Sequence, residues 1–524
     1  MITAVLRTSY IRACFQTSRN PSRNFIFTNM ASRNIVTSVS VPKLKDSSLL
    51  RHAAFINNEW IPASSETFRV IDPANGEEIG QLPEMGAKET KEAIQVASDA
   101  FKKWSRTTAK ERHDLLKKWY DIVMANQEDL ATILTWENGK TIAEARGEIA
   151  YGASFFEWFA EEAVRSYGNV IPSPIPSQRY ITIKQPVGVV GIITPWNFPN
   201  AMITRKVGAA LAAGCTVVIK PGAETPYSAL ALCELAKRIG IPAGVINVVT
   251  TEKKVAEVGK ELCTNPIVKK ISFTGSTAVG KLLMSQSSGT MKKISMELGG
   301  NAPFIVFDDA DLDAAVDGAL ASKFRGTGQT CVCANRIYVQ KGVYKAFAEK
   351  LAAKVGGFKV GHGFATDTTH GPLINDKAVE KVQRHLEDAV SKGAEVVIGG
   401  KHLGGSFFEP TVITGMTKEM TIFEEETFGP LAALFEFDTE EQVIQLANDT
   451  PFGLAGYFYS RDIGRIWRVA EALETGMVGA NSGIISSCYS PFGGVKESGV
   501  GREGSMYGMD DYLNIKYINM GGLQ

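Results

Sequence analysis

The sequence has no apolar run of the length that a membrane-spanning helix needs, which is about 20 residues. It also has no overall excess of charge, because 56 Lys and Arg residues balance 56 Asp and Glu residues. The hydrophobic content of 44% and the charged content of 21% are ordinary for a soluble globular protein. We therefore expect no membrane-spanning segment, and 524 residues suffice for two to four domains with a large core.

Acidic residues are absent from the first 45 positions, and the first carboxylate is that of Asp46. This segment is rich in Ser and Thr, lacks a central apolar block and contains seven basic residues, Arg7, Arg12, Arg19, Arg23, Arg33, Lys43 and Lys45. Such a composition is typical of a mitochondrial transit peptide, and the alternative is a disordered basic tail. We expect a mitochondrial matrix protein. Its remaining 49 basic and 56 acidic side chains give no support to nucleic-acid binding.

Cysteine and histidine are few and scattered. An odd number of cysteines without regular spacing argues against a disulfide framework. No second closely spaced pair of Cys or His accompanies Cys331 and Cys333, so the sequence does not supply four ligands for zinc and we predict no metal site. The cysteines are Cys14, Cys215, Cys233, Cys263, Cys331, Cys333 and Cys488, and the histidines are His52, His113, His362, His370, His385 and His402.

Strand and helix patterns alternate along most of the chain. Apolar residues three or four apart predict helices between 88 and 162, and prolines at 172, 174 and 176 mark a boundary loop. Continuous apolar runs predict strands that are buried on both faces. The segments are strand 179–186, strand 187–195, helix 200–214, strand 216–221, helix 228–240, and strands 244–250 and 269–276. This order predicts a doubly wound α/β sheet, which binds ligands at the carboxyl ends of its strands.

After Glu297 the alternation resumes and predicts a second α/β domain. Its first elements are a strand at 301–307, a helix at about 312–324, a strand at 336–340 and a helix beyond Lys345. A late strand pattern at 511–520 follows far along the chain. It is expected to pair either with 179–186 or with another subunit.

Cys331 lies in a polar, glycine-rich loop, GTGQTC at 326–331, near a helix end. Structural cysteines usually lie within apolar runs, as Cys215 and Cys233 do. A loop cysteine close to free backbone N–H groups can have a lowered pKa and act as a nucleophile. The pattern favours a nucleophile only modestly over a packing residue.

Three further segments carry modest signals. FTGSTAVGK (273–281) places a glycine turn between a strand and a helix, which suits a pyrophosphate or is an ordinary turn. Glu297 directly precedes two glycines, which suits a general base or an ion pair at a domain junction. Asn197 lies between two prolines after a buried strand, which suits an oxyanion donor or a turn.

In this order, the motifs together resemble the aldehyde dehydrogenase superfamily. They are TPWNFP (194–199), IKPGAETP (219–226), FTGSTAVG (273–280), ELGG (297–300), GQTC (328–331), EEETFGP (424–430) and PFGGVKESGVGREGSMYG (491–508). The resemblance runs from about Phe55 to the C-terminus. It implies a Rossmann-like cofactor domain at 46–178 and 188–296, a catalytic α/β domain at 297–490, and small oligomerisation strands at 179–187 and 505–524 in a homodimer or homotetramer.

The resemblance also implies roles for individual residues. Cys331 would attack the aldehyde carbon, Asn197 and the Cys331 N–H would hold the oxyanion, and Glu297 would activate the hydrolytic water. NAD or NADP would lie along a set of residues after the strands, Pro195, Trp196, Lys220, Ala223, Glu224, Gly275, Ser276, Gly280, Glu426 and Phe428. NAD-preferring members carry Glu three residues after the Lys at 220. Here that position is Ala223 and the acid is Glu224, so the choice of cofactor stays open.

Within the superfamily, MITRKVGAALAAG (202–214) and SKFRGTGQTC (322–331) resemble members that oxidise succinic semialdehyde. Arg205, Arg325 and Ser486 match positions that bind the distal carboxylate of that substrate. Two arginines with a hydroxyl suit a carboxylate through charge-assisted bonds, and the alternative for either arginine is a structural salt bridge.

Other functions stay open at this point. The substrate could be another ω-semialdehyde such as glutarate semialdehyde, and the chain could be a catalytically silent homologue, although the intact Cys331, Glu297 and Asn197 argue against that. A thiol hydrolase is a weaker alternative, because no nearby His supplies the usual base.

Cys333 follows Cys331 by two positions. In an extended segment the two Cα atoms lie about 6.5 Å apart, near the upper limit for a disulfide. A bond between them would be strained and easily reduced, as in redox-regulated loops, and the resemblance points the same way. The alternative is that Cys333 is a small packing residue.

Overall fold

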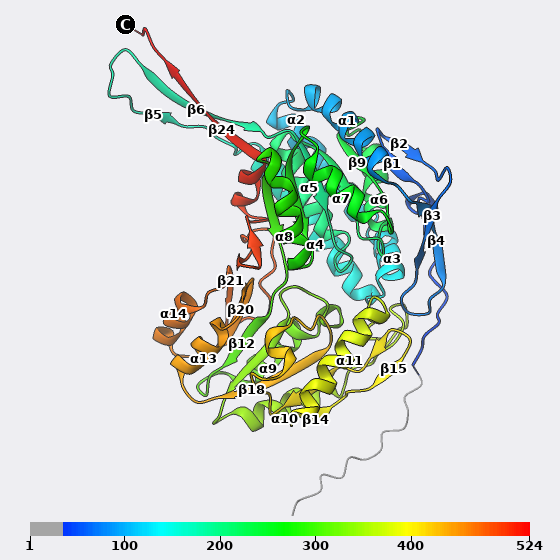
Figure 1. Cartoon of the computed structure of the whole chain (residues 1–524), viewed down its shortest axis with the longest axis vertical. Coiled ribbons are helices and arrows are strands. Elements are labelled where there is room, and N and C mark those ends of the chain that lie inside the picture. The colour runs from blue at the N-terminus through cyan, green and yellow to red at the C-terminus, as the bar shows by residue number, and fades with distance from the viewer. Residues whose placement is uncertain (1–34, 524) are drawn as a thin grey trace, which may run out of the picture. The chain divides into compact units, whose positions relative to one another are not determined.

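The computed structural model describes residues 35–523, so most of the predicted transit segment lies outside the described residues. The largest sheet has eight strands in the order β2-β1-β9-β8-β7-β10-β11-β23 (Figure 1). Its five central strands, β9 to β11, run parallel, and the outer strands join antiparallel. The strands are β1 (Ala54–Ile56), β2 (Glu59–Ile61), β7 (Val189–Ile193), β8 (Thr216–Lys220), β9 (Ile246–Val248), β10 (Val268–Thr274), β11 (Lys293–Glu297) and β23 (Gly499–Val500).

The central strands β7 and β8 of this sheet are buried from end to end. Every residue of β7 and β8 is buried, as their continuous apolar runs predict. Helices pack against the sheet and against one another. They are α1 (Ala87–Trp104), α2 (Ala109–Ala125), α3 (Gln127–Asn138), α4 (Ile142–Ala163), α5 (Ala201–Ala213), α6 (Tyr227–Arg238), α7 (Val255–Thr264) and α8 (Thr277–Ser287).

The helical pattern between 88 and 162 is divided among four helices. Thr108 and Thr141 each form a capping box that starts a new helix, α2 and α4. Gly139, at a φ of 85°, ends α3 in the left-handed conformation that favours glycine. Capping residues, rather than gaps in the apolar periodicity, therefore set these boundaries.

A second sheet has seven strands in the order β14-β17-β18-β13-β12-β20-β21, all parallel except β14. This confirms a second α/β arrangement after Glu297. The strands are β12 (Ala302–Val306), β13 (Ala334–Gln340), β14 (Glu395–Ile398), β17 (Thr411–Thr414), β18 (Leu431–Phe437), β20 (Ala455–Tyr459) and β21 (Met477–Ala480). The helices are α9 (Leu312–Lys323), α10 (Tyr344–Val355), α11 (Asp376–Ser391), α12 (Thr421–Glu424), α13 (Glu440–Asn448) and α14 (Ile463–Ala472).

A three-stranded sheet, β24-β6-β5, extends away from the other two (Figure 1). β24 (Leu513–Met520) pairs antiparallel with β6 (Arg179–Pro186) over eight residues, and β5 (Val170–Ile171) lies on the other side. The late strand thus pairs with 179–186, the first of the two predicted partners. It begins two residues later than predicted, because Met506–Tyr512 forms a 3₁₀ helix that buries Met509 and Tyr512.

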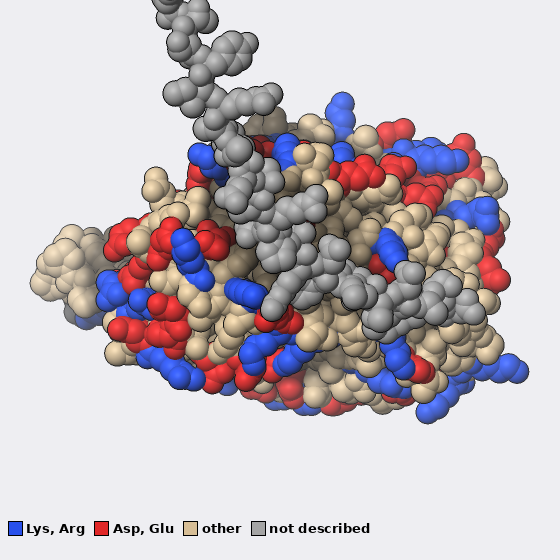
Figure 2. All heavy atoms as spheres, turned by 90° about the horizontal axis from the view of Figure 1, so that it is seen from below, with Lys and Arg blue, Asp and Glu red and all other residues tan. Residues whose placement is uncertain are grey.

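The remaining described strands are short. They are β3 (Thr67–Ile71) with β4 (Glu78–Pro83), β15 (His402–Gly404) with β16 (Phe407–Phe408), and β19 (Phe452–Gly453) with β22 (Val495–Lys496). Within residues 35–523 no helix is long and apolar enough to cross a membrane, and no group of three or more His, Cys, Asp or Glu side chains is arranged to hold a metal ion. Figure 2 shows basic and acidic side chains interspersed on the visible part of one face.

The end of the predicted transit segment is described and contacts the rest of the chain. The carbonyl of Val36 accepts a hydrogen bond from the N–H of His362, and the N–H of Lys45 donates to the Asp129 carboxylate at 2.9 Å. Residues 36 and 45 are therefore held by the folded chain.

Candidate active site

Four adjacent parallel strands end at one edge of the eight-stranded sheet. In the order β8, β7, β10, β11, the residues at this edge are Lys220, Thr194, Thr274 and Glu297. From β7 the chain continues to β8 and β9 on one side of β7, and it then returns to form β10 and β11 on the other side. The direction of the strand order therefore changes between β7 and β10. Such a switch point is where open α/β sheets bind their ligands.

A cavity of about 970 Å³ opens at this edge. Five predicted cofactor residues after β7 and β8 line it, together with Gly275 after β10; the five are Pro195, Trp196, Lys220, Ala223 and Glu224. The Lys220 ammonium makes no hydrogen bond or ion pair within residues 35–523. Burial lowers the pKa of Lys220 while the charge of Glu224 opposes that shift. A free buried cation beside a glycine turn and a helix N-terminus fits a dinucleotide.

A second cavity, of about 330 Å³, adjoins the first and also contains Pro195, Trp196 and Gly275. Ser276, Glu426 and Phe428 line it, as predicted for cofactor residues. Burial raises the pKa of Glu426 to about 7, and its carboxylate accepts a hydrogen bond from the N–H of Gly300. The rings of Trp196 and Phe428 meet edge to face at 5.6 Å, which gives this cavity an aromatic wall.

Gly280 does not line either of these cavities. It lies in α8 against the β11–β12 connection, where an added Cβ would approach the side chain of Leu298 within 2.4 Å. Its missing side chain therefore lets helix and strand approach closely. The prediction that Gly280 belongs to the cofactor site has no contact in the structure to support it.

The loop before β13 has an uncommon backbone. Between Arg325 and Gly328 the φ angles of Gly326, Thr327 and Gly328 are all positive, and Thr327 is not a glycine. At Gly328 an added Cβ would come within 2.2 Å of the Gly429 carbonyl oxygen. A threonine in the left-handed backbone conformation costs free energy and persists only where the surrounding structure enforces it. Such strained residues are frequent at functional sites.

Cys331 follows this loop and lies where two cavities meet. Cys331 lines the 330 Å³ cavity on the cofactor side and a separate cavity of about 320 Å³. Burial raises the pKa of its thiol to about 12, and the charge of Arg205 opposes that rise. The expectation of a lowered pKa from the loop position is therefore wrong for the chain alone, because burial outweighs the nearby N–H groups and cation.

Asn197 follows β7 and is 7% exposed. Its amide nitrogen donates one hydrogen bond to the Gln329 carbonyl at 3.0 Å, and its amide oxygen accepts one from the Phe198 N–H. One amide hydrogen remains for a ligand. Because Asn197 and Cys331 line the same cavity, that hydrogen can serve an oxyanion formed beside the sulfur.

Glu297 ends β11 and is buried, with no hydrogen-bond partner on either carboxylate oxygen. Burial raises its pKa well above the ordinary value, Glu503 adds to the rise, and Arg205 and Lys206 oppose it. A carboxylate with both oxygens free and a raised pKa suits a general base that acts on water near neutral pH.

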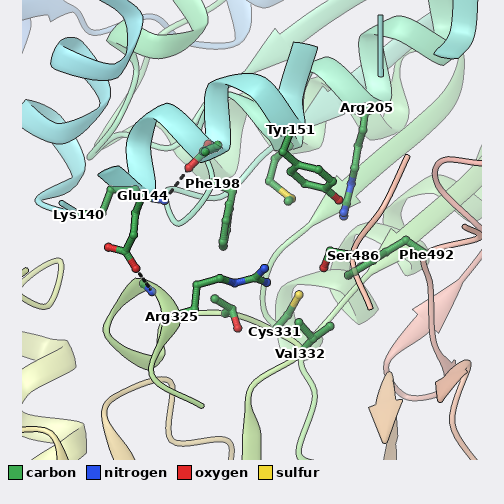
Figure 3. A pocket seen from close by; sticks show the side chains of 15 residues that line it. Lys140, Glu144, Tyr151, Phe198, Arg205, Arg325, Cys331, Val332, Ser486 and Phe492 are labelled. Carbon is green, nitrogen blue, oxygen red and sulfur yellow. Dashed lines mark hydrogen bonds and ion pairs between the residues drawn. The ribbon is translucent and has the colours of Figure 1, made fainter. Parts of the chain in front are cut away.

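The 320 Å³ cavity brings together the three predicted substrate residues, Arg205, Arg325 and Ser486, with the Cys331 thiol (Figure 3). Arg205 is 1% exposed and its Nη2 has no hydrogen-bond partner. Nε of Arg325 is likewise buried without one. Two guanidinium nitrogens without hydrogen-bond partners suit an anion, and the carboxylates of Glu144 and Glu148 line the same cavity.

Sequence reasoning missed other residues of this cavity. Tyr151 and Phe198 form part of its wall, and Phe492 lies under the Arg205 guanidinium at 4.4 Å. Glu503, in the 491–508 motif, forms an ion pair with Arg205 and a second with Lys206. Arg205 therefore has a structural partner as well as a free Nη2. No local pattern identifies these contacts, since α4, α5 and the C-terminal segment meet only in the folded chain.

The family model for the "Aldehyde dehydrogenase family" matches residues 60–518. The chain belongs to the aldehyde dehydrogenase family.

Three curated relatives cover most of this chain. The glutarate-semialdehyde dehydrogenase of Pseudomonas putida is 60% identical over 477 residues, 91% of this chain and 99% of that protein. The NADP(+) succinate-semialdehyde dehydrogenase of Escherichia coli is 58% identical, over 91% of this chain and all of that protein. The mitochondrial succinate-semialdehyde dehydrogenase of Homo sapiens is 57% identical, over 91% of this chain and 89% of that protein.

A solved structure agrees with the aldehyde dehydrogenase fold. The succinate-semialdehyde dehydrogenase from Burkholderia pseudomallei superposes with a TM-score of 0.90 at 60% identity, covering 92% of this chain and all of that chain. The predicted fold class and the predicted family are thereby confirmed.

In this aldehyde dehydrogenase, Cys333 is buried and Cys331 is partly exposed, and both are free thiols. The Cys333 sulfur lies 2.9 Å from the Thr330 hydroxyl and 3.5 Å from the Lys323 carbonyl oxygen. No histidine lines either of the two cavities that contain Cys331. The base that a thiol hydrolase would need is therefore missing from these cavities.

Proposed function

We propose that this aldehyde dehydrogenase oxidises succinic semialdehyde to succinate with NAD or NADP. The observation that carries the proposal is the unpaired, buried Nη2 of Arg205 beside Arg325 and Ser486 in the cavity that also holds Cys331. These groups suit a carboxylate at the far end of a short aldehyde, whose carbonyl carbon would then lie at the sulfur. The printed names of the relatives support the same substrate class.

The chemistry follows from the placement of the chain's own residues. Cys331, as thiolate, adds to the aldehyde carbon and forms a thiohemiacetal whose oxyanion accepts hydrogen bonds from the Asn197 amide and the Cys331 N–H. A nicotinamide bound beside Phe428 would supply the acceptor for the hydride of this carbon. Glu297 then takes a proton from water, which attacks the remaining thioester, and the carboxylic acid leaves as the Cys331 thiol is restored.

The residues along the cofactor cavities fit the dinucleotide. Lys220 and Glu426 would hold its ribose hydroxyls, with Gly275 and Ser276 near its phosphates and Phe428 beside the nicotinamide. Ala223 leaves room for a 2′-phosphate, which supports use of NADP, as the E. coli relative's name states for that enzyme. Glu224 lines the same cavity and keeps NAD possible.

A steady-state assay of the purified protein tests the proposal. Succinic semialdehyde, glutaric semialdehyde and butanal are each compared with NAD and with NADP by the rise in absorbance of the reduced cofactor. We expect kcat/KM to be highest for an aldehyde with a distal carboxylate. Equal values for butanal would contradict the assignment of Arg205 and Arg325 to the substrate.

Glutarate semialdehyde is the second candidate substrate. It carries one more methylene group between aldehyde and carboxylate, and the Pseudomonas putida relative bears its name. One methylene changes discrimination by about 10- to 200-fold in a tight pocket, so the same assay separates the two substrates.

We propose further that the protein is mitochondrial and assembles as a homodimer or homotetramer. The acid-free basic segment before Asp46 and the mitochondrial human relative support the location. The exposed apolar residues Val170, Ile515 and Tyr517 on the three-stranded sheet support assembly through that sheet. Import of a fluorescent protein fused to residues 1–45 tests the location, and light scattering on the purified protein tests the assembly.

A further inference from the structure

The short connection between α3 and α4 holds the loop that contains Asn197. The side-chain nitrogen of Asn138 donates to the Trp196 carbonyl oxygen at 2.9 Å. The Lys140 ammonium donates to the next carbonyl oxygen along the chain, that of Asn197 itself, at 2.8 Å. Asn138 and Lys140 are 4% and 5% exposed. Two consecutive peptide groups of the Asn197 loop are therefore bonded to buried side chains of a single segment.

Lys140 also connects this loop to the start of α5. Its ammonium forms an ion pair with Glu148 of α4 at 2.6 Å, and both side chains are almost fully buried. One oxygen of Glu148 accepts hydrogen bonds from the N–H groups of Asn200 and Ala201, where α5 begins. The Lys140–Glu148 pair thus contacts the chain on both sides of Phe198, whose ring lies 4.2 Å from the ammonium (Figure 3).

These contacts fix the backbone from which the Asn197 side chain projects. A hydrogen-bond donor stabilises an oxyanion only when it is aimed at the developing charge, and small displacements weaken it. The Asn197 amide is already bonded on two sides, to the Gln329 carbonyl and the Phe198 N–H. The direction of the amide then depends on the orientation of the peptide group between residues 197 and 198. Lys140 donates to the carbonyl oxygen of that peptide group.

We propose that Lys140, with Asn138, is a positioning residue that aims the Asn197 amide at the oxyanion beside Cys331. The inference rests on the proposed role of Asn197 as the oxyanion donor. Neither Lys140 nor Asn138 supplies a proton or contacts the sulfur in this account. They act through the carbonyl groups of residues 196 and 197.

The test separates aldehyde addition from thiol reactivity. Lys140→Met keeps an unbranched side chain that is one atom shorter and removes its donor, and Asn138→Ala removes the neighbouring donor. The pre-steady-state burst of reduced cofactor with succinic semialdehyde reports formation of the thioester. Alkylation of Cys331 by iodoacetamide forms no oxyanion and serves as the internal reference. Lys292→Met is the control for loss of contacts to backbone carbonyls, because Lys292 donates to those of Asn265 and Val268. Unlike Lys140, which lines the 320 Å³ cavity, Lys292 lines none of the cavities described above.

We expect the burst rate constant to fall about tenfold or more in Lys140→Met and less in Asn138→Ala, while alkylation stays within twofold of wild type in both. Because Lys140→Met leaves Glu148 buried without its cation, Lys140→Met/Glu148→Gln provides a second variant with no unpaired charge. A burst within twofold of wild type in the folded variants would overturn the inference. An unchanged burst in Asn197→Ala would instead refute the proposed oxyanion role.

Discussion

The two cavities that meet at Cys331 are lined by different kinds of residue. The cofactor side combines residues at the ends of parallel strands of the first sheet, and Gly275 and Ser276 before α8, with residues 374–381 and 426–428 from the second α/β arrangement. Lys220 is a buried cation in the larger cavity beside it. The substrate side is lined by long side chains from α4, α5 and the loop before β13, among them Arg205 and Arg325. The cofactor side thus combines strand ends with the rings of Trp196 and Phe428, whereas the pair of arginines distinguishes the substrate side.

From this difference we expect single substitutions to have different consequences on the two sides. A cradle made by strand ends and glycines depends on the whole sheet, so a change there disturbs the fold. A cavity made by side chains can be altered by single substitutions, which leave the strands in place. We therefore expect catalysis at the junction, cofactor binding at the sheet edge and substrate choice by a few side chains.

The largest expected effect lies at the junction itself. Cys331→Ala removes the only thiol that lines both cavities, and we expect aldehyde oxidation to fall by about 10⁴- to 10⁶-fold. Binding of the cofactor, followed by quenching of tryptophan fluorescence, should persist because the sheet edge is unchanged. Substantial remaining turnover would remove Cys331 from the nucleophile's role.

Glu297→Gln should slow hydrolysis of the thioester by about 10²- to 10⁴-fold and leave its formation nearly intact. In a pre-steady-state time course we expect a burst of reduced cofactor followed by slow turnover. In the wild type, the raised pKa of Glu297 means that the active, deprotonated base gains population as pH rises, so kcat should increase with pH above the ordinary range for a carboxylate. The same kcat profile in Glu297→Gln would contradict its role as base.

On the substrate side, Arg325→Ala should raise KM for succinic semialdehyde and leave KM for butanal almost unchanged. Loss of one charge-assisted contact of about 1.5–3 kcal/mol corresponds to roughly 10- to 160-fold. Arg146→Ala, a change at an exposed surface pair on α4, is the control. Arg205→Ala would give a less direct answer, because it also leaves Glu503 with one cation fewer and should lower the melting temperature. Equal losses for both aldehydes would make Arg325 structural.

On the cofactor side, Ala223→Glu should lower kcat/KM with NADP by roughly tenfold relative to NAD, since the added carboxylate repels a 2′-phosphate. The ratio of the two values in one preparation is the measurement, with Lys253→Glu at the rim of the same cavity as a control for general charge. An unchanged ratio would show that the 2′-phosphate does not lie near position 223.

The smallest effect on activity is expected at Cys333. Cys333→Ala should keep activity within about twofold under reducing conditions, because its sulfur contacts Thr330 and Lys323 rather than a cavity. In the wild type we expect peroxide to oxidise the Cys331 thiol to a sulfenic acid. The Cys333 thiol would then attack that sulfur with loss of water and form a disulfide that dithiothreitol reduces. We expect this recovery by dithiothreitol to be lost in the variant. Recovery that remains as complete as in the wild type would exclude Cys333 as the resolving thiol.

Sequence patterns were informative where local chemistry determines structure. Continuous apolar runs located β7 and β8, and the motifs around Asn197 and Cys331 identified two residues that line one cavity. Glu297 lines none of the three cavities described above. The patterns could not show that burial raises the pKa of Cys331 rather than lowering it, because burial depends on the packing of distant segments. For the same reason Glu503 was missed, since its ion-pair partner Lys206 lies 297 positions earlier.

The distance along the chain between Lys206 and Glu503 also affects the order in which contacts form during synthesis. Lys206 and Arg205 are placed in the first sheet's core but obtain their counter-charge from Glu503, and β6 obtains its eight-residue partner only when β24 has been made. At translation rates of roughly 5–20 residues per second, about 15 to 60 s pass between the two ends of this ion pair. During that interval we expect the growing chain to carry Arg205 and Lys206 without their carboxylate and β6 without its β24 partner, so these contacts are completed only after the C-terminal segment has been made.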